Sequence, residues 1–214
     1  MKYLIGILLL TGAVYSQCNE DNWQDYYNSD GRDMRGCDLT QADLKRADLS
    51  DANLEEADLR GANLTDANLK ETNLYKADFA GADLKGADLK GALFEKTNLK
   101  DTNLSGADFG LTDSTQYLSL MGVNLTGSNL TGVDLTGAGL GNVDLTQADL
   151  SDANLTGAYF RQDVRLTKAN LTGARLKGAS FEGVSLEEAN LTGANLTEAF
   201  LFADLTGANL KDAD

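Results

Sequence analysis

Apolar residues return at every fifth position over most of the chain. From Cys37 the sequence runs CDLTQ ADLKR ADLSD ANLEE, and a Leu or Phe stands at the centre of each unit up to residue 109. After a break over residues 110–119, the spacing resumes at Leu125, slips once by one residue and continues to Leu201. A period of five matches neither an α-helix, with about 3.6 residues per turn, nor a strand, in which alternate side chains share a face.

A coil with four sides buries every one of these centres. If each unit forms a short extended side followed by a turn, four units close a quadrilateral layer. Each centre then points to the axis together with the small residue two positions before it, and Gly two positions after it suits a corner with positive φ. Stacked layers would lie about 4.8 Å apart and pair their backbone N–H and C=O groups. The pattern therefore predicts an all-β solenoid of about eight parallel layers.

The repeated A(D/N)LXX unit resembles that of the pentapeptide-repeat proteins. The resemblance covers residues 37–214 and implies a right-handed quadrilateral β-helix. It implies little about activity, because the motif residues of this family are structural. Some members resemble DNA and protect topoisomerases from drugs, and others are exported to the thylakoid lumen. Fold alone does not choose between these functions.

The first sixteen residues, 1–16, have the features of an export signal. Lys2 provides a short positive start, residues 3–14 form an apolar run too short to span a bilayer, and small residues precede a cut after Ser16. We therefore expect an exported protein, periplasmic, lumenal or extracellular, with no transmembrane span in the mature chain. Two alternatives stay open: a buried N-terminal strand, and a lipoprotein acylated at Cys18, which the bulky residues around it disfavour.

Residues 17–36 lack the repeated unit and are expected to form a short helical cap over the first layer. The predicted mature chain has two cysteines, Cys18 and Cys37. An even number of cysteines in an exported chain favours a disulfide, which here would close a loop of about 20 residues. Alternatively, Cys37 is simply a small core residue, because it stands where most units have Ala. The cap prediction depends on three aromatic residues at helical spacing: Trp23, Tyr26 and Tyr27.

The chain is strongly acidic, with 33 acidic and 18 basic residues and a formal net charge of -15. This charge opposes direct binding to nucleic acid or anionic membranes, and a partner steered by charge should be basic. The chain has no His, the commonest general base and metal ligand. Asp38, Asp58 and Asp78 should form a column on one face, which we interpret as a solvated surface. We therefore expect no enzyme, no catalytic residue, no metal site and no cofactor.

Exceptions to the repeat indicate where a partner protein binds. The position before each centre is normally Asp or Asn but is apolar at Leu93, Tyr159 and Phe200, which we predict as a contact patch. On a count of four units per layer, Tyr159 and Phe200 share a face two layers apart. The break at 110–119 should bulge from a corner as a loop. The open C-terminal end is a further candidate contact and is compatible with a homodimer.

The favoured function is an exported, non-enzymatic scaffold or protein-binding module whose partner is unknown. One alternative is an acidic DNA mimic that binds a topoisomerase, against which export argues. Another is a flat-surface binder of ice or glycans, with this candidate polar face: Asn129, Thr131, Asn170, Thr172, Asn190 and Thr192. The expected organisation is a signal peptide, a cap, a first repeat segment, a loop and a second repeat segment: residues 1–16, 17–36, 37–109, 110–119 and 120–214.

Overall fold

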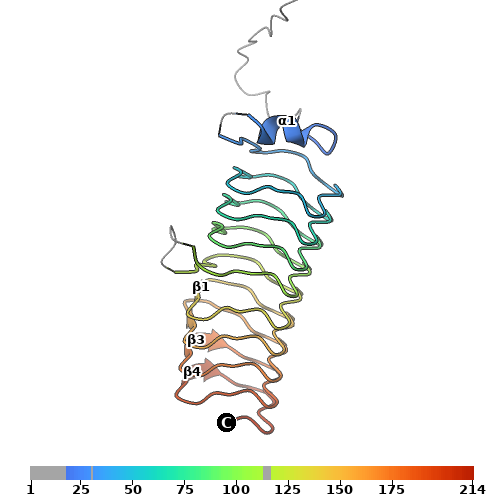
Figure 1. Cartoon of the computed structure of the whole chain (residues 1–214). Helices are drawn as coiled ribbons and strands as arrows, with labels where there is room; N and C mark the ends of the chain where they lie inside the picture. The colour runs from blue at the N-terminus through green and yellow to red at the C-terminus, as the bar shows by residue number, and fades with distance from the viewer. Residues whose placement is uncertain (1–17, 30, 113–116) are drawn as a thin grey trace, which may run out of the picture.

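The computed structural model describes residues 18–29, 31–112 and 117–214, and the predicted signal segment lies outside these residues. The described chain is a solenoid with α1 (Trp23–Tyr27) at its N-terminal end and the C-terminus at the other end (Figure 1). Four strands lie one beyond another along one side, in a parallel sheet of order β1-β2-β3-β4. They are β1 (Gly139–Gly141), β2 (Tyr159–Arg161), β3 (Ser180–Ser185) and β4 (Phe200–Asp204).

Outside these strands, neighbouring layers pair through isolated parallel bridges. In the regular parts, equivalent residues of neighbouring layers lie 20 positions apart, as Asp78 and Asn98 do. Nine layers follow one another among the described residues, as this series of bridged residues shows: Asp43, Asn63, Asp83, Asn103, Asn129, Asp149, Asn170, Asn190 and Asn209. The quadrilateral β-helix predicted from the five-residue period is confirmed, with one layer more than the expected eight or so.

We number the four faces of the solenoid. Each side of a layer is identified by its leading residue, which is the one directly before the unit centre and forms the bridges between layers. In the first complete layer, faces 2, 3 and 4 start at Asp38, Asp43 and Asp48, in chain order, and Asn19 bridges to Asp38. The four strands begin on face 1, β3 and β4 run on to the first residue of face 2, and the pairing between them shifts register between Glu182 and Val184. The leading residues of face 1 are Asp33, Asn53, Asn73, Leu93, Ser119, Gly139, Tyr159, Ser180 and Phe200.

The corners explain why the unit has five residues. Leu39, a centre, and Ala42, the next small residue, are both buried, and the Leu39 carbonyl accepts the Ala42 N–H at 3.1 Å. Between them Gln41 has a φ of 59°, so each corner is a four-residue turn whose third residue is left-handed, as in a type II turn. Left-handed backbone costs a non-glycine residue on the order of 1–2 kcal/mol. The Gln41 N–H donates to the Arg60 carbonyl of the next layer at 2.9 Å, which offsets this cost.

The Asp or Asn before each centre acts both within its unit and between layers. Oδ1 of Asp43 accepts the Lys45 N–H at 3.3 Å and Nδ2 of Asn63 in the next layer at 3.0 Å. The carboxylate thus accepts the backbone N–H that would otherwise be available to extend the strand by pairing with a neighbouring layer. Each of the four strands begins instead at a residue that is neither Asp nor Asn: Gly139, Tyr159, Ser180 and Phe200.

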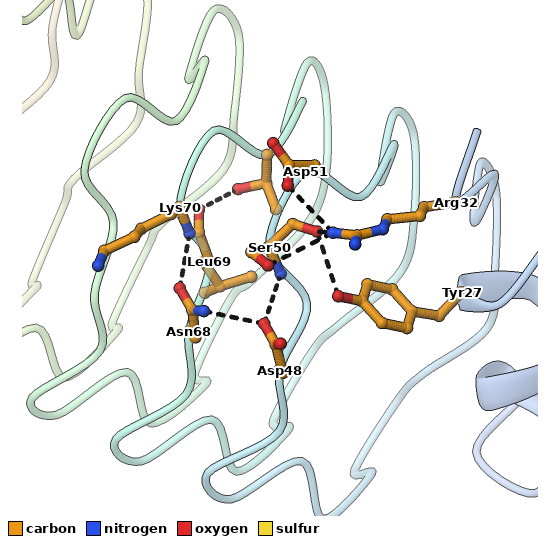
Figure 2. Close-up of polar contacts among 9 residues, drawn as sticks. Tyr27, Arg32, Asp48, Ser50, Asp51, Asn68, Leu69 and Lys70 are labelled. Carbon is orange, nitrogen blue, oxygen red and sulfur yellow. Dashed lines mark hydrogen bonds and ion pairs between the residues drawn. The ribbon is translucent and has the colours of Figure 1, made fainter. Parts of the chain in front are cut away.

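The predicted N-terminal cap lies over the first layer. Tyr27 donates from its hydroxyl to the Ser50 carbonyl at 3.3 Å (Figure 2). Arg32 donates to the same carbonyl and pairs with Oδ2 of Asp51 at 3.0 Å. No helix among the described residues has the length and apolar character that crossing a membrane requires. The aromatic residues that predicted the cap are partly buried and pack against the core: Trp23, Tyr26 and Tyr27.

Cys18 and Cys37 form the predicted disulfide, at a sequence separation of 19 residues. Both are buried, at 2% and 1% exposure, so Cys37 is at the same time a bonded residue and a small core residue. The Cys18 carbonyl also accepts the Asp38 N–H at 3.0 Å. The disulfide therefore ties the start of the described chain to the first repeats.

The repeat breaks between face 4 and face 1. Asp108 is the last bridged residue before the break, and Ser119 already bridges to β1, so the ladder resumes within the segment predicted as a loop. Leu120 is a fully buried centre, which corrects our expectation that the centres resume at Leu125. The expectation was wrong because the unit of Leu120 has Leu118 and Ser119 where other units have Ala and then Asp or Asn.

Candidate functional site

The three residues predicted as a contact patch all lie on face 1. Phe200 lies two layers beyond Tyr159, as the sequence count predicted. Leu93 belongs to the same face because Asn98 bridges to Asn124, and these residues follow Leu93 and Ser119 by five positions each. The side chains are accessible: Leu93, Tyr159 and Phe200 are 57%, 50% and 61% exposed.

Almost all exposed large apolar side chains gather on this side of the solenoid. Of nine such side chains among the described residues, only Leu210 lies elsewhere, on face 3. The other eight lie on face 1 or in the segment that leads into it: Leu93, Leu111, Tyr117, Met121, Tyr159, Phe200, Leu201 and Phe202. Leu201 and Leu210 lie in the last layer, at the C-terminal end that was predicted as a further candidate contact. They are 40% and 39% exposed. A single-sided distribution of this kind is typical of an interaction surface.

Sequence reasoning missed half of the apolar positions on face 1. It compared only the position before each centre, although the position after the centre also points outward. On face 1 this second position is apolar or aromatic in three layers: Tyr75, Met121 and Phe202. Scanning both positions, one face at a time, would have found them.

Two glycines in β1 stand at positions of face 1 where most other layers have side chains. Gly139 and Gly141 lie between the layer of Met121 and the layer of Tyr159. Neither has positive φ, and a Cβ at either residue would have no contact closer than 3.5 Å. Neither backbone conformation nor lack of space therefore requires glycine here, and the Met121 side chain lies near Gly141, where a Cβ would be 3.8 Å from its Cγ.

Two cationic side chains on or beside face 1 lie next to its aromatic rings. The Arg161 guanidinium carbon lies 5.4 Å from the centroid of the Tyr159 ring. Nζ of Lys96 lies 5.5 Å from the centroid of the Tyr75 ring and 3.7 Å from Oε1 of Glu95. Such cation–π contacts are worth about 0.5–1 kcal/mol at exposed sites, so they orient these rings without withdrawing them from solvent.

The predicted column of aspartates lies on face 2. Asp38, Asp58 and Asp78 bridge successive layers. Arg60 donates to both carboxylate oxygens of Asp58, at 2.8 and 2.6 Å, and these hydrogen bonds hold the pKa of Asp58 below its usual range. Nδ2 of Asn98 donates to Asp78 at 2.8 Å. The column is thus paired with neighbouring side chains, and the described residues contain no group of three or more Cys, Asp or Glu that could hold a metal ion.

The candidate polar face is in register on face 3, where bridges join Asn129, Asp149, Asn170 and Asn190 in turn. Each Thr hydroxyl of the face donates to the Asn of its own unit, at 2.6 or 2.7 Å: Thr131, Thr172 and Thr192. Nδ2 of Asn190 donates to the Thr172 hydroxyl of the preceding layer at 2.9 Å. The hydroxyl hydrogens of Thr131, Thr172 and Thr192 are therefore engaged in hydrogen bonds within this face.

The sequence profile of pentapeptide repeats matches the chain in eight copies, at residues 33–71, 72–110, 119–162 and 165–201. The chain belongs to the pentapeptide repeat family. The right-handed quadrilateral β-helix implied by the repeat is the fold of this family, and the nine stacked layers agree with it.

Solved structures of pentapeptide repeat proteins are similar to this chain. HetL, involved in heterocyst differentiation regulation in the cyanobacterium Nostoc sp. strain PCC 7120, is 37% identical over 85% of this chain and 82% of HetL, with a TM-score of 0.37. A protein of the Arabidopsis thaliana thylakoid lumen is 36% identical over 49% of this chain and 65% of its own, with a TM-score of 0.36. QnrB1, a plasmid-mediated fluoroquinolone resistance protein, is 22% identical over 85% of this chain and 82% of its own, with a TM-score of 0.42. Curated protein sequences contain no significant match.

Proposed function

We propose that this pentapeptide repeat protein is an exported, non-enzymatic scaffold that binds a partner protein along face 1. The observation that supports the proposal is the gathering of eight of the nine exposed large apolar side chains of the described residues on or beside this face. From Leu93 to Phe200 the stripe crosses five layer spacings, or roughly 24 Å at about 4.8 Å each. A stripe of this length suits contact with one helix or one extended segment of a partner.

The charge of the chain indicates a partner with basic residues around its apolar contacts. The net charge is -15, and Glu95 and Glu182 stand at second positions of face 1 between the apolar side chains. Lys or Arg residues of the partner would be attracted to these carboxylates, and an acidic partner would be repelled.

Export is the part of the proposal that rests on residues 1–16. The Cys18–Cys37 disulfide supports it, because such bonds persist mainly in oxidising compartments, and it occupies the sulfur that a thioether-linked lipid would need. We expect the protein recovered from its native cell, carrying a C-terminal fluorescent fusion, to begin at Gln17 when its intact mass is measured. Cytoplasmic fluorescence together with a mass that still includes residues 1–16 would contradict export.

The face 1 proposal is tested by restoring the ordinary residue of the repeat at its apolar positions. The triple variant Leu93→Asn, Tyr159→Asn, Phe200→Asn should keep the fold, because Asn is common at this position in the other layers. Removing three apolar contacts should weaken partner capture at least about tenfold, since buried contacts of this kind dominate interface energies. The measurement is quantitative crosslinking and mass spectrometry in the native compartment.

A matched control changes face 3 and leaves face 1 intact. The double variant Asn129→Asp, Asn190→Asp also exchanges one repeat residue for another, and it should capture the same proteins as the wild type. If the face 1 triple variant, with an unchanged melting temperature, captures them equally well, face 1 is not the binding surface.

A further inference from the structure

A pocket lies at the break in the repeat, where the spacing between equivalent residues rises from 20 to 26 positions. Faces 2 and 3 keep their bridges across the break, for example between Asn98 and Asn124. On face 1 no bridge among the described residues joins Leu93 to Ser119, and face 4 is interrupted in the same way after Asp108. The two neighbouring layers therefore part on faces 1 and 4 while they stay joined on faces 2 and 3.

The pocket has a volume of about 750 Å³, within the range typical of ligand sites. Three of the side chains that line the pocket are accessible to solvent: Leu93, Tyr117 and Met121 are 57%, 72% and 52% exposed. Glu95 is the one charged residue among the described residues that line it. The apolar and aromatic part of the lining includes Tyr75, Leu93, Phe94, Phe109, Tyr117 and Met121.

The break also leaves backbone groups without their partners between layers. In the preceding layer the Leu74 N–H donates to the Leu93 carbonyl, and the Thr72 carbonyl accepts the Leu93 N–H, both at 2.9 Å. The equivalent groups at the pocket are the N–H of Phe94 and the carbonyl of Ala92, and neither has a bond of this kind across the break. Because an amide group buried without a partner costs free energy, an occupant with both a donor and an acceptor is favoured.

We propose that this pocket binds one aromatic or large aliphatic side chain of a peptide segment in the partner protein, next to a Lys or Arg of that segment. The apolar walls match the side chain, the N–H of Phe94 and the carbonyl of Ala92 match a peptide backbone, and Glu95 matches the cation. The inference rests on the proposed function, because the segment belongs to the partner of face 1. It places that side chain of the partner beside Leu93, at the end of the apolar stripe nearer the N-terminus.

Methionine methyl groups provide the test. The chain has three methionines; Met121 lines the pocket, and Met34, a fully buried centre of face 1, serves as an internal control. The full chain, labelled with ¹³C at the methionine methyl groups, is titrated with the dipeptides N-acetyl-Trp-Lys-amide and N-acetyl-Trp-Glu-amide. We expect the ring current of the indole to shift the Met121 methyl signal and leave that of Met34 unchanged.

Two substitutions separate the two parts of the proposal. The Lys dipeptide should have a dissociation constant about fivefold lower than that of the Glu dipeptide, and Glu95→Gln should remove this difference. Leu93→Asn should weaken binding of both dipeptides about tenfold, whereas Phe200→Asn, on the same face but far along the solenoid, should change neither. Leu93→Asn and Phe200→Asn both introduce the residue that the repeat commonly has before a centre, so folding should be preserved.

An unmoved Met121 signal, or equal binding of the two dipeptides to the wild type, overturns the pocket assignment. These results are separable from the face 1 experiment. If Met121 stays silent while the triple variant loses its partner, the pocket assignment fails and the scaffold function stands. If Met121 responds as expected while the triple variant keeps its partner, the proposed binding along face 1 fails.

Discussion

Replacing Phe181 with alanine is expected to lower the free energy of unfolding by about 3–5 kcal/mol. Phe181 is fully buried and stacks on Phe160 of the preceding layer, with ring centroids 4.5 Å apart and planes 8° from parallel. The variant loses the buried ring and its stacking partner. The surrounding layers cannot collapse into the cavity, because hydrogen bonds between layers fix their spacing. Urea denaturation followed by circular dichroism measures the loss.

Phe181→Leu is the matched control, because Leu is the usual centre of a unit. This change keeps most of the buried volume and should cost less than about 1.5 kcal/mol. If both variants lose the same stability, the stacked pair contributes nothing beyond an ordinary unit centre and the larger estimate is wrong. Amide exchange should place the damage of Phe181→Ala in the layers next to residue 181, since each layer of a solenoid contacts only its neighbours.

Loss of the Cys18–Cys37 disulfide is expected to destabilise the N-terminal layer by about 3 kcal/mol, the value for a loop of this size. The bond ties the segment that carries α1 to the first repeats, and the hydrogen bond from Tyr27 to Ser50 holds the same segment from the other side. Reduction should therefore accelerate amide exchange over residues 19–54. Residues 125–160 should stay protected, because only neighbouring layers are coupled.

Two measurements check this expectation. Thiol titration of the unfolded, unreduced protein should find no free thiol, and two free thiols per chain would show that the disulfide is absent. The double variant Cys18→Ser, Cys37→Ser should reproduce the exchange pattern of the reduced protein. A uniform increase in exchange along the whole chain would instead mean that the layers unfold as one cooperative unit.

The layered fold was predictable because a single physical requirement determines it. A centre that recurs every five residues can be buried every time only if the chain turns one corner per unit, and the positions of Tyr159 and Phe200 on a common face follow from counting units. The disulfide was likewise predictable from two cysteines next to the first repeat. Leu120 was missed because a centre is recognised in the sequence by its neighbours, and its neighbours depart from the unit.

The pocket was not predictable, because it depends on how the structure accommodates extra residues. The number of residues in the break says nothing about which faces keep their bridges. In the structure the extra residues lie at the corner between face 4 and face 1. Phe94 and Phe109, which occupy ordinary centre positions, therefore line a cavity. The ion-pair partner of a side chain was also not predictable from the sequence. Arg60 pairs with Asp58 of its own unit, although Asp38 and Asp78 lie in the layers on either side.

The interrupted ladder has a mechanical consequence. Elsewhere the layers are held on all four faces, so bending the solenoid in any direction strains bridges on at least one side. At the break, the bridges among the described residues join the layers on the adjoining faces 2 and 3, so bending about the corner between these faces would break no bridge on faces 1 or 4. We therefore expect the two parts of the solenoid to bend relative to each other at the break, and an occupant between Leu93 and Met121 to change the angle between them.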